Sequence, residues 1–357
     1  MALSVKDFFN TQLFLKIPQP TTSFASKTVI ITGANSGLGK EAVKHIVTLG
    51  ATKVILACRS LSKGNEAKFA LQRFLKCSPD ALEVWELDLE SPASVKEFAA
   101  RANKLDRLDV LINNAGIQTL NFSVVYGTER AVAVNVIGTF LLACLIVPKL
   151  METSARLGVD THLTFVGSAL FNAAKYPRNH GDDIFTYLSE KKNVDMMNQY
   201  NLSKLFQILS VIQLASIVDP LTSTKASASN RLIINTLDPC FCKTGLAREI
   251  SGVLRPVFTL FEFLFARTAE EGSRLVVQTA SAGGETHGGY MRSGELKTYP
   301  PLITSEGGVR RRKYIWELLE KTLEVSANTD IPLFSLWSEQ LSLGEEHDRF
   351  ETALPTP

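Results

Sequence analysis

A glycine-rich segment between a β-branched run and an amphipathic segment is the feature that most constrains the fold. Residues 27–32 read Lys-Thr-Val-Ile-Ile-Thr, and residues 33–39 read Gly-Ala-Asn-Ser-Gly-Leu-Gly. The first run is typical of a strand buried on both faces. Residues 38–49 carry apolar side chains at helical spacing, and another β-branched run follows at 53–58. This order predicts a strand–turn–helix–strand unit whose glycine turn lets backbone N–H groups approach a pyrophosphate at the helix N-terminus.

The same alternation of strand and helix patterns continues along the chain. Further strands are expected at 83–87, 108–113, 161–167 and 231–237, and further helices at 62–76, 92–104, 127–151 and 199–218. Strands that alternate with helices predict a parallel sheet covered on both faces, and right-handed crossovers make it doubly wound. The fold class is therefore α/β, a single Rossmann-fold domain at 27–325 with an inserted substrate loop and a C-terminal helical extension. Residues 1–26 are expected to be a lead-in, and 326–357 a peripheral tail.

Charge, cysteine content and hydropathy exclude several classes of protein. A formal net charge of +2 over 357 residues is too balanced for a nucleic-acid partner. The five cysteines are odd in number and fit no disulfide framework, which predicts free thiols in the reducing cytoplasm. No run of 18 apolar residues occurs, so no transmembrane span is expected. His162, His180 and His287 share no ligand spacing, so we expect them at the surface or in loops and expect no bound metal.

The end of the 53–58 strand indicates which dinucleotide is bound. A site for NAD places a carboxylate there, where it hydrogen-bonds the ribose 2′-hydroxyl. This chain instead has Cys58 followed by Arg59 and Ser60. A guanidinium suits a 2′-phosphate through charge-assisted hydrogen bonds, and Lys40 just past the glycine turn would add a second positive charge. The sequence therefore predicts NADP(H). The alternative for Arg59 is a solvated surface residue.

The glycine spacing Gly33-x-x-x-Gly37-x-Gly39 resembles that of the classical short-chain dehydrogenase/reductase family. Further stretches occur in the family's order, namely Leu87-Asp88-Leu89, Asn113-Asn114-Ala115-Gly116, Ala133-Val134-Asn135-Val136, and Ser168 with Tyr200-x-x-x-Lys204. The resemblance covers about residues 27–295. Within the family, the stretch from Arg267 to Ser273 and Gly288-Gly289-Tyr290 resemble the C-terminal segment of retinol-dehydrogenase-like and fungal biosynthetic reductases.

The resemblance implies a hydride transfer between nicotinamide and a carbonyl or alcohol carbon. It implies that Ser168, Tyr200 and Lys204 are catalytic, with Asn135 anchoring a water in the proton relay from Lys204. Lys204 would also hydrogen-bond the nicotinamide ribose. The residues expected at the cofactor are Gly33, Asn35, Ser36, Gly37, Leu38, Gly39, Lys40, Arg59, Asp88, Asn114, Ala115, Gly116, Tyr200, Lys204, Pro239 and Thr244. For Asn135, a purely structural role in kinking its helix stays open beside the catalytic one.

The spacing of Tyr200 and Lys204 carries a chemical argument of its own. Residues four apart share one face of a helix. A phenol has a reference pKa near 10, and a nearby ammonium favours the phenolate and lowers that pKa. Tyr200 is therefore expected to act as general acid in reduction and as general base in oxidation.

Three departures from the family pattern concern the substrate side of the site. The usual Pro-Gly is Pro239-Cys240, which predicts a stiffer turn, although Thr244 remains as a carboxamide contact. The gap from Ser168 to Tyr200 is longer than usual and is expected to build part of the substrate pocket. The residue after Ser168 is Ala169, so a second serine cannot assist.

Residues 253–266 contain four phenylalanines and predict an amphipathic lid over the site. Such a lid suits a hydrophobic small-molecule substrate, such as a terpenoid, polyketide, steroid or retinoid. Plain core packing and weak adhesion to a membrane surface are the alternatives for this segment. Two other functions stay open, namely isomerisation, dehydration or cyclisation in the same pocket, and a redox-silent binding protein. Monomer and homodimer are both compatible with the sequence.

Overall fold

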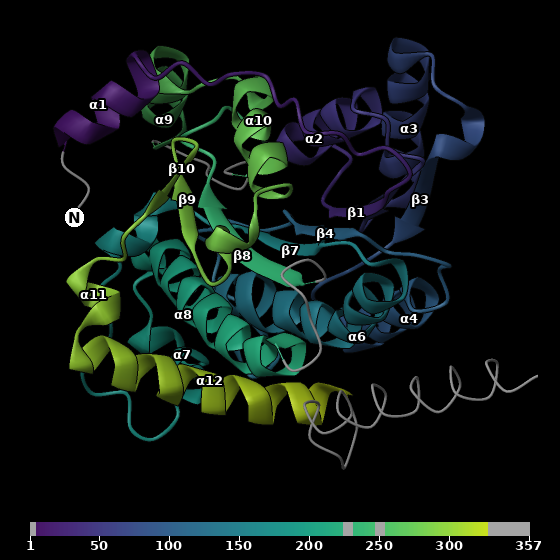
Figure 1. Cartoon of the computed structure of the whole chain (residues 1–357). Helices are drawn as coiled ribbons and strands as arrows, with labels where there is room; N and C mark the ends of the chain where they lie inside the picture. The colour runs from purple at the N-terminus through teal and green to yellow at the C-terminus, as the bar shows by residue number, and fades with distance from the viewer. Residues whose placement is uncertain (1–4, 224–230, 247–253, 328–357) are drawn as a thin grey trace, which may run out of the picture.

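An eight-stranded sheet forms the centre of the protein, whose computed structural model describes residues 5–223, 231–246 and 254–327 (Figure 1). Its strands are β1 (Thr28–Thr32), β2 (Lys53–Cys58), β3 (Leu82–Glu86), β4 (Val110–Asn113), β7 (Thr161–Val166), β8 (Leu232–Asp238), β9 (Tyr290–Arg292) and β10 (Glu295–Lys297). Their spatial order is β10-β9-β8-β7-β4-β1-β2-β3. Every neighbouring pair is parallel except β9 with β10. The predicted parallel, doubly wound sheet is therefore confirmed.

Helices cover both faces of the sheet, as Figure 1 shows. One face carries α2 (Gly37–Thr48), α3 (Leu61–Leu75) and α10 (Ala269–Thr279). The other carries α4 (Pro92–Ala102), α6 (Thr139–Leu157) and α8 (Met196–Ser223), with α12 (Glu306–Ala327) packed outside α8. The remaining helices are α1 (Val5–Leu13), α5 (Arg130–Val132), α7 (Ile184–Leu188), α9 (Leu254–Phe265) and α11 (Pro301–Thr304). A small hairpin of β5 (Val124–Val125) and β6 (Thr128–Glu129) stands apart from the sheet.

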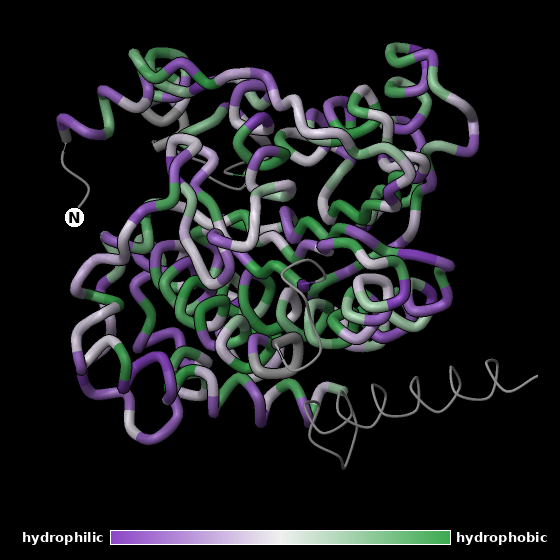
Figure 2. The backbone as a smooth tube through the Cα atoms, in the orientation of Figure 1, coloured by the Kyte–Doolittle hydropathy of each residue, from purple (hydrophilic) through white to green (hydrophobic). Residues whose placement is uncertain are grey.

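Side-chain alternation along β1 explains why both faces need cover. Ile30 packs into the core with α4, α6 and α8, whereas Val29 and Ile31 pack into the core with α2, α3 and α10. All five residues of β1 are buried. Successive side chains of a strand point to opposite faces, so an unbroken apolar run requires a layer on each side. Figure 2 shows this distribution, with hydrophobic colour along the central strands and hydrophilic colour on the outer turns.

The order of the strands reverses between β1 and β4, because β2 and β3 lie on one side of β1 and β7 to β9 lie on the other. Ligands of open α/β sheets bind at such a switch point, outside the carboxyl ends of the strands. The glycine turn after β1 and the segment after β4 both lie at that edge.

The predicted 127–151 helix differs from the observed one at both ends. Thr128 and Glu129 form strand β6, so the helical segment begins at Arg130, and it continues to Leu157. The Glu129 carboxylate caps the new start by accepting from the N–H groups of Ala131 and Val132. Between α5 and α6 the chain makes a π-helical turn, η2 (Ala133–Gly138). Such turns are rare and frequent at functional sites.

The prediction that the histidines lie at the surface or in loops is wrong for His162. It lies on β7 and is only 3% exposed. Its Nε2 pairs with the carbonyl oxygen of Ala282 at 3.0 Å, and burial lowers its pKa to about 4. A strand in the middle of a parallel sheet has no solvent face, which is why a polar residue there is buried. His180 and His287 are partly exposed.

Two helical segments are long and apolar enough to cross a membrane by length and composition, Arg130–Leu157 and Met196–Asp219. Their most apolar windows are 89% and 72% buried inside the protein. Both pack against the sheet as core helices. Core helices of this kind account for the pattern without a membrane.

Candidate active site

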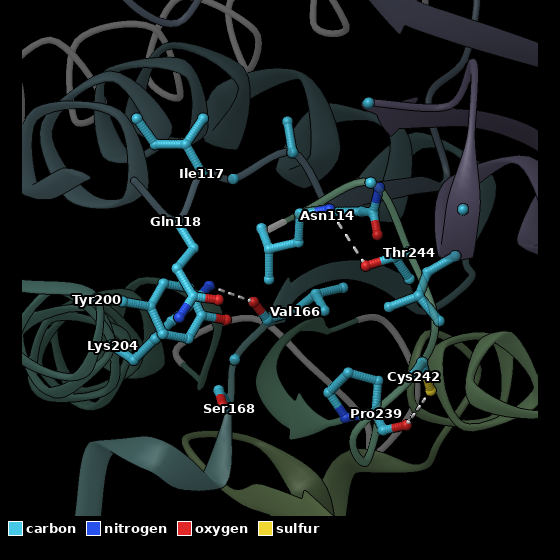
Figure 3. Close-up of a pocket in the computed structure, with 18 of the residues that line it drawn as sticks. Asn114, Ile117, Gln118, Val166, Ser168, Tyr200, Lys204, Pro239, Cys242 and Thr244 are labelled. Carbon is cyan, nitrogen blue, oxygen red and sulfur yellow. Dashed lines mark hydrogen bonds between the residues drawn. The ribbon is translucent and has the colours of Figure 1, made fainter. Parts of the chain in front are cut away.

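A cavity of about 540 Å³ opens at the carboxyl edge of the sheet. Residues from the glycine turn line it together with the ends of β3, β4, β7 and β8 and with parts of α1, α8 and α9. Figure 3 shows Tyr200, Lys204 and Ser168 on one side of this cavity and Asn114 and Thr244 on the other. The phenol and the glycine turn predicted from the sequence therefore face one space.

The glycine turn has the close packing that its sequence requires. Gly33 has φ +66°, in the left-handed region that side chains disfavour. A Cβ on Gly39 would lie 2.6 Å from Asn114 Nδ2 and 2.7 Å from the carbonyl oxygen of Gly33, which leaves no room for a side chain. Ser36 is the N-cap of α2 and makes no side-chain cap hydrogen bond. The N-terminus of α2 is thus open to an anion in the cavity, as a bound pyrophosphate requires.

The predicted loop residues divide into lining and supporting ones. Those that line the cavity are Gly33, Asn35, Ser36, Gly37 and Leu38. Gly39 does not line it and instead allows the close approach of Asn114. Lys40 does not line it either, so the structure does not bring this second positive charge to the cavity. Lys40 lies about one helical turn beyond Ser36 on α2, so its side chain is further from the helix N-terminus.

Arg59 lines the cavity at the end of β2 and is half exposed. Its Nη1 lies 3.2 Å from Glu90 Oε1, and Arg130 Nη2 lies 2.8 Å from the same oxygen. Glu90 therefore stays paired with Arg130 when the guanidinium of Arg59 turns to a ligand. Asp88, which is expected at the cofactor, also lines the cavity and accepts a hydrogen bond from the N–H of Glu90.

Asn114 braces the sheet beside the cavity, as the resemblance implies. Its Nδ2 donates to the carbonyl oxygen of Thr32 at 2.8 Å, and its N–H donates to Thr32 Oγ1 at 3.0 Å. The N–H of Ala115 donates to the same hydroxyl at 2.8 Å. These bonds join the ends of β1 and β4 and hold Ala115 and Gly116 at the cavity wall.

Ser168, Tyr200 and Lys204 come together at the end of β7 and on the first turns of α8. The side chain of Ser168 hydrogen-bonds the Tyr200 phenol. Lys204 Nζ lies 5.8 Å from the centre of the Tyr200 ring and donates to the carbonyl oxygen of Val166 at 2.8 Å (Figure 3). Tyr200 and Lys204 are 8% and 6% exposed, and what exposure they have is toward the cavity they line.

The pKa of Tyr200 moves in the direction opposite to the one predicted. Burial raises it, the hydrogen bond from Ser168 lowers it, and the Asp238 charge raises it again. Burial also lowers the pKa of Lys204, to about 7. Without a cofactor, the effect of burial on the pKa of Tyr200 is larger than the effect of the nearby Lys204 amine. A lysine that is only partly protonated stabilises a phenolate weakly. The phenol is therefore held in its protonated form.

Asn135 is fully buried in η2 and does not line the cavity. Its Oδ1 accepts from the N–H of Ile117 at 2.8 Å, and its Nδ2 donates to the Ile117 carbonyl oxygen at 2.9 Å and to Ser203 Oγ at 3.0 Å. The side chain thus fixes the segment after β4. Its backbone carbonyl oxygen accepts from Gln207 Nε2 at 3.3 Å.

The turn after β8 departs from the family at Cys240, and the structure shows the consequence. Cys240 has φ +68°, the left-handed conformation that a glycine adopts without strain. Cys242 Sγ donates to the carbonyl oxygen of Pro239 at 3.2 Å, which tightens the same turn (Figure 3). Pro239 and Thr244, which are expected at the cofactor, both line the cavity.

The predicted lid forms helix α9, and residues 247–253 before it lie outside the described part of the chain. Phe261 and Glu262 of α9 line the cavity, whereas Leu260, Phe263 and Leu264 are exposed on its outer side. The side chain of Glu262 is 7% exposed. A largely buried carboxylate therefore lines the cavity next to Phe261.

Helix α1 closes the cavity beside α9, a role that the sequence analysis did not predict for the lead-in. Gln12 Nε2 donates to the carbonyl oxygens of Phe241 and Phe265 at 2.8 and 3.0 Å, and Gln12 Oε1 accepts from the Phe241 N–H at 3.2 Å. Phe8 stacks on Phe261 with ring centres 5.9 Å apart. Phe8, Thr11 and Gln12 line the cavity.

The prediction that the long 169–198 segment builds the substrate pocket holds only for its start. Ala169 and Leu170 line the cavity. Further along, Phe171 and the apolar residues of α7 are buried in the core with α6 and α8. These side chains gain more by burial against the helices than at an open cavity, which draws the segment away from the site.

The sequence analysis also did not predict an ion pair between Asp238 and Arg292, two residues that line the cavity. Asp238 ends β8, and Arg292 ends β9, with Arg292 Nε 3.5 Å from Asp238 Oδ2. Burial raises the pKa of Asp238, while Arg292 and backbone N–H groups of Ala169 and Cys240 lower it. The only sequence signal was an acidic residue at the end of an expected strand.

The fold and these side chains define a class of protein, the Rossmann-fold oxidoreductases. A family model for short chain dehydrogenases matches residues 27–159. The chain is 37% identical over 322 residues to the short chain dehydrogenase/reductase dmxR8 of Cryptosporiopsis sp., covering 89% of this chain and 96% of that protein. It is 35% identical over 321 residues to the short chain dehydrogenase FGM9 of Gibberella zeae, covering 90% and 92%. The chain belongs to the short-chain dehydrogenase/reductase family.

Solved structures agree on the fold at much lower identity. A short-chain type dehydrogenase/reductase from Mycobacterium marinum superposes with a TM-score of 0.56 at 19% identity, covering 81% of this chain and 97% of that one. A short-chain dehydrogenase from Sphingobium yanoikuyae in complex with NADPH superposes with a TM-score of 0.50 at 19% identity, covering 70% and 83%. A 3-ketoacyl-(acyl-carrier-protein) reductase from Brucella melitensis complexed with NADH gives a TM-score of 0.52 at 19% identity, covering 76% and 97%.

Proposed function

We propose that this protein is a cytoplasmic, NADP(H)-dependent oxidoreductase that interconverts a carbonyl and an alcohol on a hydrophobic small molecule. The observation that carries the proposal is that Ser168, Tyr200 and Lys204 face the same cavity as the glycine turn. Family membership supports oxidoreductase chemistry, and the likeness to fungal biosynthetic reductases favours a role in secondary metabolism.

The choice of NADP(H) is supported by the end of β2. Asn35, Ser36 and the open N-terminus of α2 would hold the pyrophosphate, and Arg59 would hold the 2′-phosphate. Arg59 is half exposed and lines the cavity, so its guanidinium is accessible to a ligand. A guanidinium in this place favours a phosphate over the bare 2′-hydroxyl.

The proton chemistry follows from the protein's own groups. The bound dinucleotide would supply the hydride to the carbonyl carbon in reduction. Ser168 holds the carbonyl oxygen, and Tyr200, protonated because burial raises its pKa, donates its proton to that oxygen. Lys204 then returns a proton to the phenolate. Because the pKa of Lys204 is about 7, both of its protonation states are populated near neutral pH. The same steps in reverse serve oxidation.

Apolar side chains in the cavity support a hydrophobic substrate. Phe8, Phe241, Phe261 and Leu246 line the cavity. Apolar linings with few polar groups bind apolar ligands and orient them by those polar groups. Glu262 is a largely buried carboxylate next to Phe261, so we expect a substrate with a hydroxyl group some distance from the reacting carbonyl.

The test is a panel of apolar carbonyl compounds incubated with NADPH, read by loss of NADPH absorbance and by product mass. Tyr200→Phe is expected to lower kcat by about 10²–10⁴-fold while the Kd for NADPH stays near that of the parent. Tyr187→Phe, on α7 and away from the cavity, is the matched control. Parental turnover in Tyr200→Phe would overturn the mechanism, and product formation without NADPH consumption would favour isomerisation, dehydration or cyclisation.

A further inference from the structure

Gln207 occupies the space between Lys204 and Asn135. Lys204 Nζ donates to Gln207 Oε1 at 3.1 Å, and Gln207 Nε2 donates to the Asn135 carbonyl oxygen at 3.3 Å. Gln207 is 2% exposed and lies one turn beyond Lys204 on α8. The resemblance implies that Asn135 anchors a water in the proton relay from Lys204. An amide side chain bridges the same two groups directly.

The orientation of this amide is fixed by its partners. The Asn135 carbonyl oxygen only accepts hydrogen bonds, so it takes the amide nitrogen and leaves the amide oxygen to Lys204. Asn135 is itself held at both ends of its side chain by Ile117 and Ser203. The π-helical turn η2 presents its carbonyl toward α8. A rotated amide would set its nitrogen against the ammonium and an oxygen against a carbonyl, losing both bonds.

Two hydrogen-bond acceptors next to Lys204 determine the direction of its remaining N–H group or lone pair. The Val166 carbonyl oxygen and Gln207 Oε1 take two N–H groups. An ammonium has three N–H groups, so the third faces the cavity that Lys204 lines. A neutral amine has two, so the lone pair faces the cavity instead. The position that exchanges a proton thus faces the cavity, which Tyr200 also lines, in both protonation states.

We propose that Gln207 is the positioning residue for Lys204, holding its exchangeable proton toward the cavity and closing the branch of the proton relay that would run past Asn135. An amide donates and accepts hydrogen bonds. Unlike a water, it does not pass a proton from one hydrogen-bond partner to the other. The proton that Lys204 gives to Tyr200 must then be replaced from the cavity. This inference rests on the proposed function for Lys204 as proton carrier.

The titratable and charged groups that share the cavity with Lys204 can affect its titration. Besides Tyr200 on the same helix, they are Arg59, Asp88, Glu90, Asp238, Cys240, Cys242, Glu262 and Arg292. Burial is the cause that lowers the pKa of Lys204, to about 7. A change at Gln207 alters the nearest acceptor, and a hydrogen bond to the charged form raises the pKa of an amine.

The test titrates Lys204 in the cofactor-free protein. Lysine labelling at a series of pH values, read on the Lys204 peptide by mass spectrometry, gives the midpoint for each variant. In Gln207→Glu a carboxylate faces the amine, and we expect the midpoint to rise by about 1–3 pH units. In Gln207→Met the acceptor is lost, and we expect the midpoint to fall. Gln213→Glu, six residues along the same helix, is the control.

The same variants separate positioning from a structural role. The pH profile of kcat should shift with the labelling midpoint, in opposite directions for Gln207→Glu and Gln207→Met. Unchanged midpoints in both folded variants would overturn the proposal. If Gln207→Met fails to fold, the direction of the Gln207→Glu shift alone decides. A shifted midpoint in a protein that turns over no carbonyl would refute the proposed function and leave the positioning role intact.

Discussion

Arg59 is the side chain on which the proposed choice of NADP(H) depends. It follows a buried cysteine at the end of β2, where a carboxylate would favour the bare ribose. Its partner Glu90 is shared with Arg130, whose Nε and Nη2 both reach the same oxygen, at 3.1 and 2.8 Å. Arg59 can therefore turn to a phosphate while Glu90 stays paired with Arg130.

We expect Arg59→Asp to weaken NADPH binding by at least about tenfold, corresponding to the loss of one charge-assisted contact and the gain of a repulsion. NADH binding should change less or improve, because the new carboxylate accepts from the ribose 2′-hydroxyl. Fluorescence titration of each dinucleotide measures both constants. Arg73→Asp, an exposed charge reversal on α3, controls for net charge. Equal affinity of Arg59→Asp and the parent for NADPH would show that the phosphate is held elsewhere.

The Tyr200–Lys204 pair marks the limit of sequence reasoning at single residues. The four-residue spacing placed both groups on one face of a helix, and the structure confirms that they share a cavity. The direction of the pKa of Tyr200 could not be predicted, because it depends on burial by residues distant in sequence. Asp238, which also raises it, lies 38 positions further along the chain.

At the scale of elements, the parts that could be predicted are those whose pattern is local. The β-branched strands and their amphipathic partners alternate with regular spacing, and the structure contains each of them within a few residues. Helix α1 gave no such signal. Its role depends on Gln12, whose partners lie 229 and 253 residues away. A kink at Asn135 was one of the two roles left open for that residue, but its π-helical form could not be predicted, because the apolar pattern matches an α-helix.

The pairing of α1 with α9 makes a prediction at this scale. Gln12→Leu removes the hydrogen bonds that Gln12 Nε2 donates to the carbonyl oxygens of Phe241 and Phe265, at a cost of about 0.5–1.5 kcal/mol each. We expect α1 to loosen over the cavity and the KM for an apolar carbonyl substrate to rise by about tenfold. The Kd for NADPH should change much less, since its expected contacts come from the glycine turn and β2. Steady-state kinetics and dinucleotide titration measure the two effects.

Gln19→Leu is the matched control, since Gln19 is an exposed glutamine of the same lead-in whose Nε2 donates to Glu270 Oε1 at 3.2 Å. An unchanged KM in Gln12→Leu would mean that α1 does not shape the substrate side. A fall in NADPH affinity equal to the rise in KM would instead place α1 over the cofactor.

At the scale of the whole molecule, the sheet that aligns the site also determines how stability depends on pH. The carboxyl ends of β1, β4, β7 and β8 bring the glycine turn, Asn114, Ser168 and Asp238 to one edge. That edge exists only while the parallel strands stay in register. His162 lies on β7, between β4 and β8 in the middle of this sheet, where it is in register with Val110 and Ile233. Charging it would place an ion in the core of the domain.

Stability should therefore fall in mild acid because of His162. Its pKa is lowered to about 4 by burial in the folded state, against 6.5 in the unfolded chain. Between these values the unfolded chain binds more protons, so the free energy of unfolding falls as the pH falls through 6.5 toward 4. The contribution between pH 7.5 and pH 5 is about 2 kcal/mol. Urea unfolding of the parent, of His162→Asn and of the control His180→Asn at both pH values measures it. His162→Asn should lose less stability than the other two on acidification, because the charging of His162 has been removed and every other titrating group is retained. Identical losses in all three proteins would show that His162 is protonated in the fold without penalty.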